Sequence, residues 1–160
     1  MKQIAEIEQL FDTMNAEMQT LRATYQKRGQ EIFKLAFREF FAANPEVNVI
    51  GWRQYTPYFN DGEACVFNCY AEYAFVSNAK DYENIRYGEY EGDEENIWVD
   101  DGDYGDYNQE LIPDHVASNT AALRKLLSKI DDDVFLDMFG DHVQVFATRE
   151  GFDVQEYDHD

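Results

Sequence analysis

The chain has 160 residues, of which 44% are apolar and 16% aromatic, and its formal net charge is −20. This length suits one domain with a substantial hydrophobic core, and the aromatic content excludes a disordered chain. The charge repels nucleic acids and anionic membranes and speeds encounter with basic proteins. We therefore expect a basic protein as partner, with no direct binding of nucleic acid or membrane.

Residues 1–44 are predicted to form one long helix that ends at Asn44-Pro45. Large apolar residues alternate spacings of three and four, as in the a/d seam of a coiled coil. After an expected interruption at Gly29, a second stripe rich in phenylalanine follows. The seam has seven members: Ile4, Ile7, Phe11, Met14, Met18, Leu21 and Tyr25. The helix can lie on its own domain or pair with another chain, and the narrow seam with mixed-charge flanks favours self-association.

Residues 45–160 are predicted to form an α+β domain, in which two hairpins build a small antiparallel sheet with two short helices between them. The apolar period changes to two after Pro45, and the Asp-Gly pair at 61–62 is typical of a hairpin turn. This turn would pair Gln54 with Cys69.

One face of this first hairpin gathers the bulky residues and is expected to meet the core. Its predicted members are Ile50, Trp52, Tyr58, Cys65, Phe67, Cys69, Ala71, Tyr73 and Phe75. The α-carbons of Cys65 and Cys69 would lie roughly 13 Å apart along a strand, too far for a disulfide. We expect two small buried thiols in a reducing compartment.

Helices are expected over roughly 116–130 and after the aspartates at 131–133, and a second hairpin turns at Glu150-Gly151. A two-residue turn there puts His142 opposite His159. With the neighbouring Asp141, Asp158 and Asp160, the two imidazoles could hold a zinc ion. The ordinary interpretation, a solvated chain end, is favoured because termini fray, and we expect no metal.

Residues 78–114 form an acidic insertion, with Ile85 and residues 96–99 as its aliphatic anchors. Residues 81–114 hold thirteen acids against Arg86 alone, so −12 of the net −20 lies in this one segment. The acid spacing does not fit the calcium loop of an EF-hand. Five aromatic rings in residues 87–107 argue against a merely solubilising loop.

The segments WRQYTPYFNDGEACVF (52–67) and FGDHVQVFATREGFDVQEYDHD (139–160) resemble small uncharacterised proteins of tailed bacteriophages. With the Phe-rich helix and Pro45, the resemblance covers about two thirds of the chain but not its acidic middle. It implies a phage accessory protein in the cytoplasm of a host bacterium, and it assigns no site residue. The charged N-terminus and the lack of a long apolar run agree with a soluble intracellular protein.

No nucleophile elbow, P-loop or HExxH motif is present, so we expect no enzyme and no cofactor. The leading hypothesis is a DNA mimic, whose acidic surface occupies the nucleic-acid-binding site of a host protein such as a defence nuclease. The expected partner-binding residues are Glu89, Glu91, Asp93, Glu94, Glu95, Trp98, Asp100, Asp101, Asp103, Tyr104 and Asp106. The alternative is an assembly protein that self-associates through the helical seam.

Overall fold

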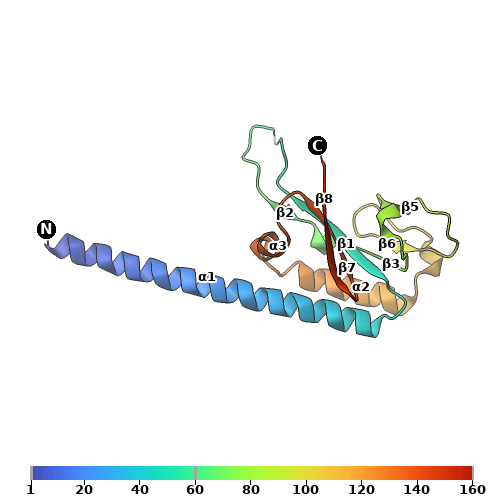
Figure 1. The fold of residues 1–160 in the computed structure, drawn as a ribbon, viewed down its shortest axis with the longest axis horizontal. Helices are drawn as coiled ribbons and strands as arrows, with labels where there is room; N and C mark the ends of the chain where they lie inside the picture. The colour runs from blue at the N-terminus through green and yellow to red at the C-terminus, as the bar shows by residue number, and fades with distance from the viewer. Residues whose placement is uncertain (1, 60, 160) are drawn as a thin grey trace.

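A computed structural model of the chain describes residues 2–59 and 61–159 (Figure 1). It confirms an α+β fold, with helices α1, α2 and α3 packed on one face of an antiparallel sheet. The elements are α1 (Lys2–Ala43), β1 (Val49–Tyr55), β2 (Asn68–Cys69), η1 (Ala71–Tyr73), β3 (Phe75–Ser77), η2 (Tyr82–Asn84), β4 (Ile85–Arg86), β5 (Glu89–Tyr90), β6 (Val99–Asp100), η3 (Gln109–Leu111), α2 (Asp114–Leu127), α3 (Asp132–Phe139), β7 (Val143–Thr148) and β8 (Gly151–Glu156).

Helix α1 passes through Gly29 without a break, which confirms the single long helix predicted over residues 1–44. A Cβ atom at Gly29 would lie 3.1 Å from Cγ2 of Val134 in α3. On the next residue, Gln30 Nε2 donates a hydrogen bond of 2.6 Å to Asp137 Oδ2. Gly29 therefore allows α3 to pack closely against α1 and does not end a helix.

The end of α1 is capped from within the domain, at the place that Asn44-Pro45 predicts. The Asn44 side chain donates a hydrogen bond of 2.7 Å to the carbonyl of Phe40. Arg149, far along the chain, donates to the carbonyls of Phe41 and Asn44 at 3.2 and 3.0 Å. A guanidinium at a helix C-terminus satisfies free carbonyls and complements the helix dipole.

The sheet is larger than two hairpins. Its strand order is β6-β3-β1-β7-β8, with β2 also paired to β1, and every pair is antiparallel. The predicted pairing of Gln54 with Cys69 is confirmed. Strand β3, directly before the acidic insertion, and strand β6, inside it, add the part of the sheet that the two predicted hairpins do not account for.

Beyond Tyr55 the first hairpin opens into a loop, and the predicted burial of Tyr58 and Cys65 is wrong. Tyr58 is 59% exposed and Cys65 is also exposed. Thr56 donates from its backbone N–H and its hydroxyl to Asp141, at 2.7 and 2.6 Å, instead of to a strand partner. Pro57 then has no N–H to offer, so the ladder stops.

The face predicted for the rest of this hairpin also changes. Residues 71–73 form the short 3-10 helix η1, which leaves Tyr73 exposed. Phe75 follows on the face opposite Trp52 and belongs to a second hydrophobic cluster. Cys69 is half-buried as a free thiol, and burial raises its pKa. A turn of 3-10 helix thus breaks the period of two on which the face prediction depended.

The second hairpin has a different register from the one predicted. Thr148 pairs with Gly151, so the turn lies at 149–150 instead of 150–151. Val145 is therefore opposite Val154, and Ala147 is opposite Phe152. The pairing of β7 with β8 is thus shifted by two residues from the predicted pairing, and a shift of two leaves every side chain on the same face of the sheet. Val143, Val145 and Ala147, which the sequence places on one face with Phe152 and Val154, therefore still share that face.

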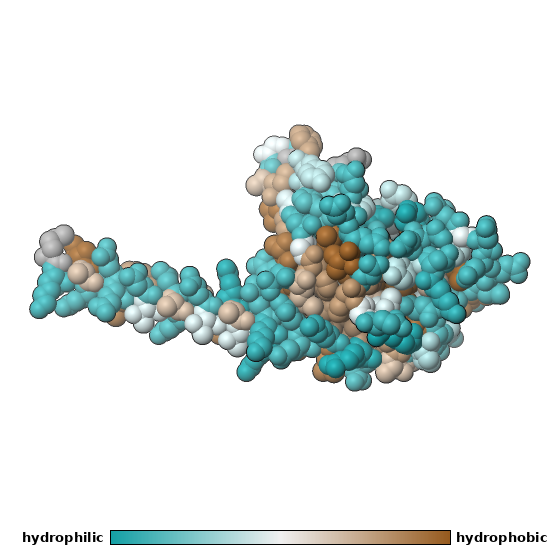
Figure 2. Space-filling view, in the orientation of Figure 1, coloured by the Kyte–Doolittle hydropathy of each residue, from teal (hydrophilic) through white to brown (hydrophobic). Residues whose placement is uncertain are grey.

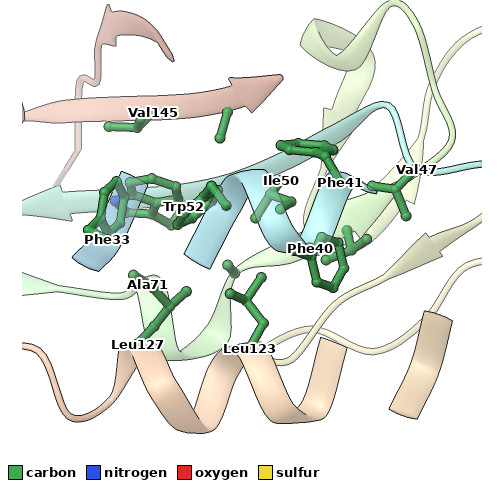
Figure 3. Packing of buried hydrophobic residues seen from close by; sticks show 14 of the residues in the cluster. Phe33, Phe40, Phe41, Val47, Ile50, Trp52, Ala71, Leu123, Leu127 and Val145 are labelled. Atoms are coloured by element: carbon green, nitrogen blue, oxygen red, sulfur yellow. The ribbon is translucent and has the colours of Figure 1, made fainter. Parts of the chain in front are cut away.

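The main core lies between the sheet and the three helices (Figure 3). Phe33 of α1 meets Trp52 of β1 edge-on, with ring centroids 5.9 Å apart. Leu123 and Leu127 of α2 point toward this layer from the other side of the picture. The fully buried Gln54 donates to the carbonyls of Phe135 and Gly140, at 3.0 and 2.7 Å. Hydrogen bonds thus tie the end of α3 to the central strand.

Candidate acidic partner-binding surface

The acidic insertion is folded onto the sheet. Strand β6 pairs with β3, with Ser77 opposite Val99. Backbone hydrogen bonds of 3.0 and 2.9 Å between Val99 and Tyr107 then close the loop 100–106 at its base. The Ser77 hydroxyl donates to the carbonyl of Trp98 at 2.7 Å. Both ends of this acidic loop are therefore fixed to the edge of the sheet.

A second hydrophobic cluster holds the insertion on the face of the sheet opposite α1. The predicted anchors Ile85 and Val99 belong to it, and the small hairpin of β4 and β5 adds Tyr90. The Tyr90 hydroxyl donates to Asp81, and this hydrogen bond is the main cause that raises the pKa of Tyr90 to about 12. The cluster consists of Val49, Phe75, Ala79, Ile85, Tyr90, Ile97, Val99 and Phe146.

Acidic side chains themselves shape the loop 100–106. Asp101 Oδ1 accepts hydrogen bonds from the backbone N–H groups of Asp103 and Tyr104, at 2.8 and 3.1 Å. Asp106 Oδ1 accepts from the N–H of Asp101 at 2.9 Å. Such bonds from aspartate to nearby backbone are typical of tight turns. These carboxylates therefore hold the loop in one conformation and still face water.

Most of the predicted partner-binding residues do lie on the surface. Tyr104 is 56% exposed, and Asp101 is half-buried. In Figure 2 the end of the domain that carries β5 and β6 is almost wholly hydrophilic on the visible face. Seven of the predicted acids are exposed: Glu89, Glu91, Asp93, Glu94, Glu95, Asp103 and Asp106.

Two of the predicted surface residues are buried, and for them the prediction is wrong. Trp98 is 3% exposed and belongs to the main core. Asp100 is 7% exposed and forms an ion pair of 2.7 Å with Arg124 of α2. Burial raises the pKa of Asp100, and the Arg124 guanidinium offsets part of this effect. The pairing of β6 with β3 turns both side chains inward, away from any partner.

A tyrosine-lined pocket, which the sequence did not predict as a unit, lies beside the acidic loop. Its cavity is about 100 Å³. Tyr87 and Tyr104 of the insertion form one wall, with ring centroids 5.1 Å apart. Tyr55 and Tyr157 form another, with centroids 5.6 Å apart. Tyr70, Tyr73, Arg53, Asp101 and Asp103 also line the pocket.

Arg53 joins the two walls of this pocket. Its guanidinium carbon lies 5.3 Å from the ring centroid of Tyr87 and 4.7 Å from that of Tyr157. Both distances are within the range of a cation–π contact. Burial raises the pKa of Tyr55 and of Tyr157, so both phenols stay neutral and remain hydrogen-bond donors. The pocket is therefore lined by aromatic rings and flanked by carboxylates.

His142 and His159 meet at the chain end, but not as the directly opposite pair that the sequence predicted, because the N–H of Tyr157 donates to the carbonyl of His142 at 2.9 Å. His142 Nδ1 and His159 Nε2 lie 2.7 Å apart in a hydrogen bond, and Tyr58 stacks on both rings at 4.9 and 4.2 Å. Within residues 2–59 and 61–159, no three His, Cys, Asp or Glu side chains gather as metal ligands would. Asp160, the third ligand considered from the sequence, lies outside the described residues.

The chain matches no family model, no curated protein and no solved structure. No helix in the described part of the chain combines the length and apolar character that a membrane crossing requires. The geometry and the charge of the chain itself are therefore the basis for inferring its function.

Proposed function

We propose that the protein is a non-enzymatic binding protein that presents the acidic insertion to a basic site on another protein. The observation that carries this proposal is the combination of order and charge. Seven exposed carboxylates lie on a segment that β6, the second hydrophobic cluster and the Asp101 turn hold in place. A preformed surface loses little conformational entropy on binding. It should therefore bind a partner more tightly than a disordered loop of the same charge would.

The kind of partner follows from the density of the charge. Duplex DNA carries one negative charge per roughly 1.7 Å of its axis, so a protein that imitates it must group several carboxylates. Glu89 and Glu91 flank the buried Tyr90 and so point outward together, and Asp93 to Glu95 continue the series. We infer that the partner uses this site for nucleic acid, as a nuclease of a host bacterium does.

The tyrosine-lined pocket gives this surface a candidate centre. Aromatic faces attract a Lys or Arg side chain, and Asp101 and Asp103 add two carboxylates against the single charge of Arg53. A basic side chain of the partner would therefore enter beside the acidic loop. Buried aromatic and arginine contacts of this kind dominate many protein interfaces.

A pull-down from bacterial lysate with a matched pair of variants tests the proposal. The surface variant neutralises Glu89, Glu91, Asp93, Glu94, Glu95 and Asp103 to their amides. The control neutralises six exposed acids outside the insertion: Glu6, Glu39, Asp61, Glu63, Glu150 and Glu156. Both variants change the net charge equally, so nonspecific attraction falls by the same amount in each.

The wild type and the control should capture the same basic nucleic-acid-binding protein, and the surface variant should lose it. Duplex DNA in excess should compete, and rising salt should weaken the capture because salt screens exposed charges. Capture that survives in the surface variant, or that DNA does not reduce, would contradict the proposal.

A further inference from the structure

The N-terminal half of α1 leaves its apolar seam uncovered. Every residue from Lys2 to Tyr25 is exposed, and in Figure 1 this part of the helix extends beyond the domain. The seven seam side chains are between 48 and 64% exposed. Apolar side chains appear along the projecting helix among hydrophilic ones in Figure 2. A regular apolar stripe of this length on a soluble helix marks an interaction surface.

The seam is longer than the sequence indicated. After Arg28, Ile32 and Leu35 continue the same spacing, and they are 53 and 50% exposed. Phe33 and Phe37, which face the core of the domain, lie on another side of the helix and are buried. The exposed seam therefore runs from Ile4 to Leu35, about 47 Å of helix at 1.5 Å per residue. The domain does not cover its C-terminal part.

We propose that this seam binds the seam of a second copy of the chain in an antiparallel two-helix coiled coil. A standard protein interface buries roughly 800 Å² on each partner, and nine large apolar side chains, each about half exposed, provide an area of that order. The spacing of three and four is the one that interlocks two helices in this way.

The charges of α1 select the antiparallel orientation. Residues 6–17 hold four acids and no base, whereas residues 22–28 hold three bases and no acid. If Ile4 lies opposite Leu35 of the second copy, residues 6–17 face residues 22–33 of that copy, which hold three bases and the one acid Glu31. Phe11 then lies opposite Arg28, Asp12 opposite Lys27, and Glu17 opposite Arg22. A parallel pair would instead place like charges together, with two Arg28 side chains in one layer of the seam. The antiparallel pair also opposes the two helix dipoles.

This arrangement puts the two α+β domains at opposite ends of the paired helices. The two acidic surfaces then point to separate partners, or to two sites on one partner, which strengthens binding through multivalency. Dimerisation does not depend on what the acidic surface binds. A failure of one proposal therefore leaves the other standing.

Light scattering after size-exclusion chromatography of the full chain tests the dimer. The wild type should have twice the monomer mass. The double variant Phe11→Glu/Met18→Glu should lose half of that mass, because it puts charge into the seam. The matched control Thr13→Glu/Thr20→Glu adds the same charge to exposed positions beside the seam and should stay dimeric. A monomeric wild type, or a seam variant with unchanged mass, would overturn the proposal.

Disulfide cross-linking tests the orientation, in a Cys65→Ser background that removes the exposed native thiol. The antiparallel pair brings position 7 of one copy next to position 32 of the other. A disulfide needs α-carbons roughly 4.4 to 6.8 Å apart. On oxidation, a mixture of Ile7→Cys and Ile32→Cys chains should form the mixed dimer. Efficient linkage of Ile7→Cys chains to one another would show a parallel pair and overturn the antiparallel arrangement.

Discussion

At the scale of single residues, the buried Gln54 links the sheet to α3. It donates to two carbonyls of the α3 region and accepts a hydrogen bond of 3.0 Å from Trp52 Nε1. Gln54→Leu would leave all three groups without this partner, at about 1–3 kcal/mol for each buried group that stays unpaired. We expect the free energy of unfolding in urea to fall by about 2–5 kcal/mol. The exposed control Gln19→Leu should change it by less than about 0.5 kcal/mol. Equal effects of the two variants would refute this role.

Asp141 is the residue whose contribution should depend most clearly on pH. Burial favours its neutral form, but hydrogen bonds from Thr56 and from the N–H of His142 outweigh burial and lower its pKa. A carboxyl with a lowered pKa stabilises the fold above its unfolded value of about 3.9, and this contribution is lost as the pH falls toward the folded value.

The variant Asp141→Asn should therefore destabilise the protein more at pH 7 than at pH 3, by about 1 kcal/mol or more at the higher pH. Urea denaturation at the two pH values, both away from the sequence pI of about 4.2, measures the difference. A loss of stability that is the same at both values would show that the charge of Asp141 does not contribute.

At the scale of elements, α1 has two parts that differ in burial. Its C-terminal part buries Phe33, Phe37, Phe40 and Phe41, whereas residues 2–25 are exposed. A chain that lacks residues 1–24 should keep the core. Its urea midpoint should therefore equal that of the full-length seam variant Phe11→Glu/Met18→Glu. Circular dichroism should record the loss of the deleted helical residues only. A clearly lower midpoint in the truncated chain would mean that this part of α1 supports the domain.

At the scale of the whole molecule, the net charge of −20 destabilises the folded state through repulsion. Sodium chloride screens exposed charges, so the urea midpoint of the wild type should rise with salt. The surface variant with six neutralised acids should start at a higher midpoint and respond less to salt. A midpoint that falls with salt would instead show that attractive ion pairs, such as Asp100–Arg124, outweigh the repulsion.

How far the sequence can predict the fold and the site depends on how local each signal is. The helical stripe that places α1, and the Asp-Gly turn that pairs Gln54 with Cys69, act over a few residues. The charge of the insertion is a property of composition, and the exposure of its acids follows from it. The alternation of the second hairpin is also local, so Val143, Val145 and Ala147 share a face with Phe152 and Val154 although the turn lies one residue earlier than predicted.

Residues whose partners lie far along the chain could be placed only from the folded structure. Trp98 and Asp100 looked like surface residues of an acidic loop, but β6 pairs with β3, and Arg124 of α2 neutralises the buried carboxylate. The tyrosine-lined pocket likewise joins β1, the insertion and the C-terminal segment. Helices and turns depend on residues that are close in the sequence, so their patterns can be recognised there. Burial and charge pairing depend on contacts that form only when distant segments meet.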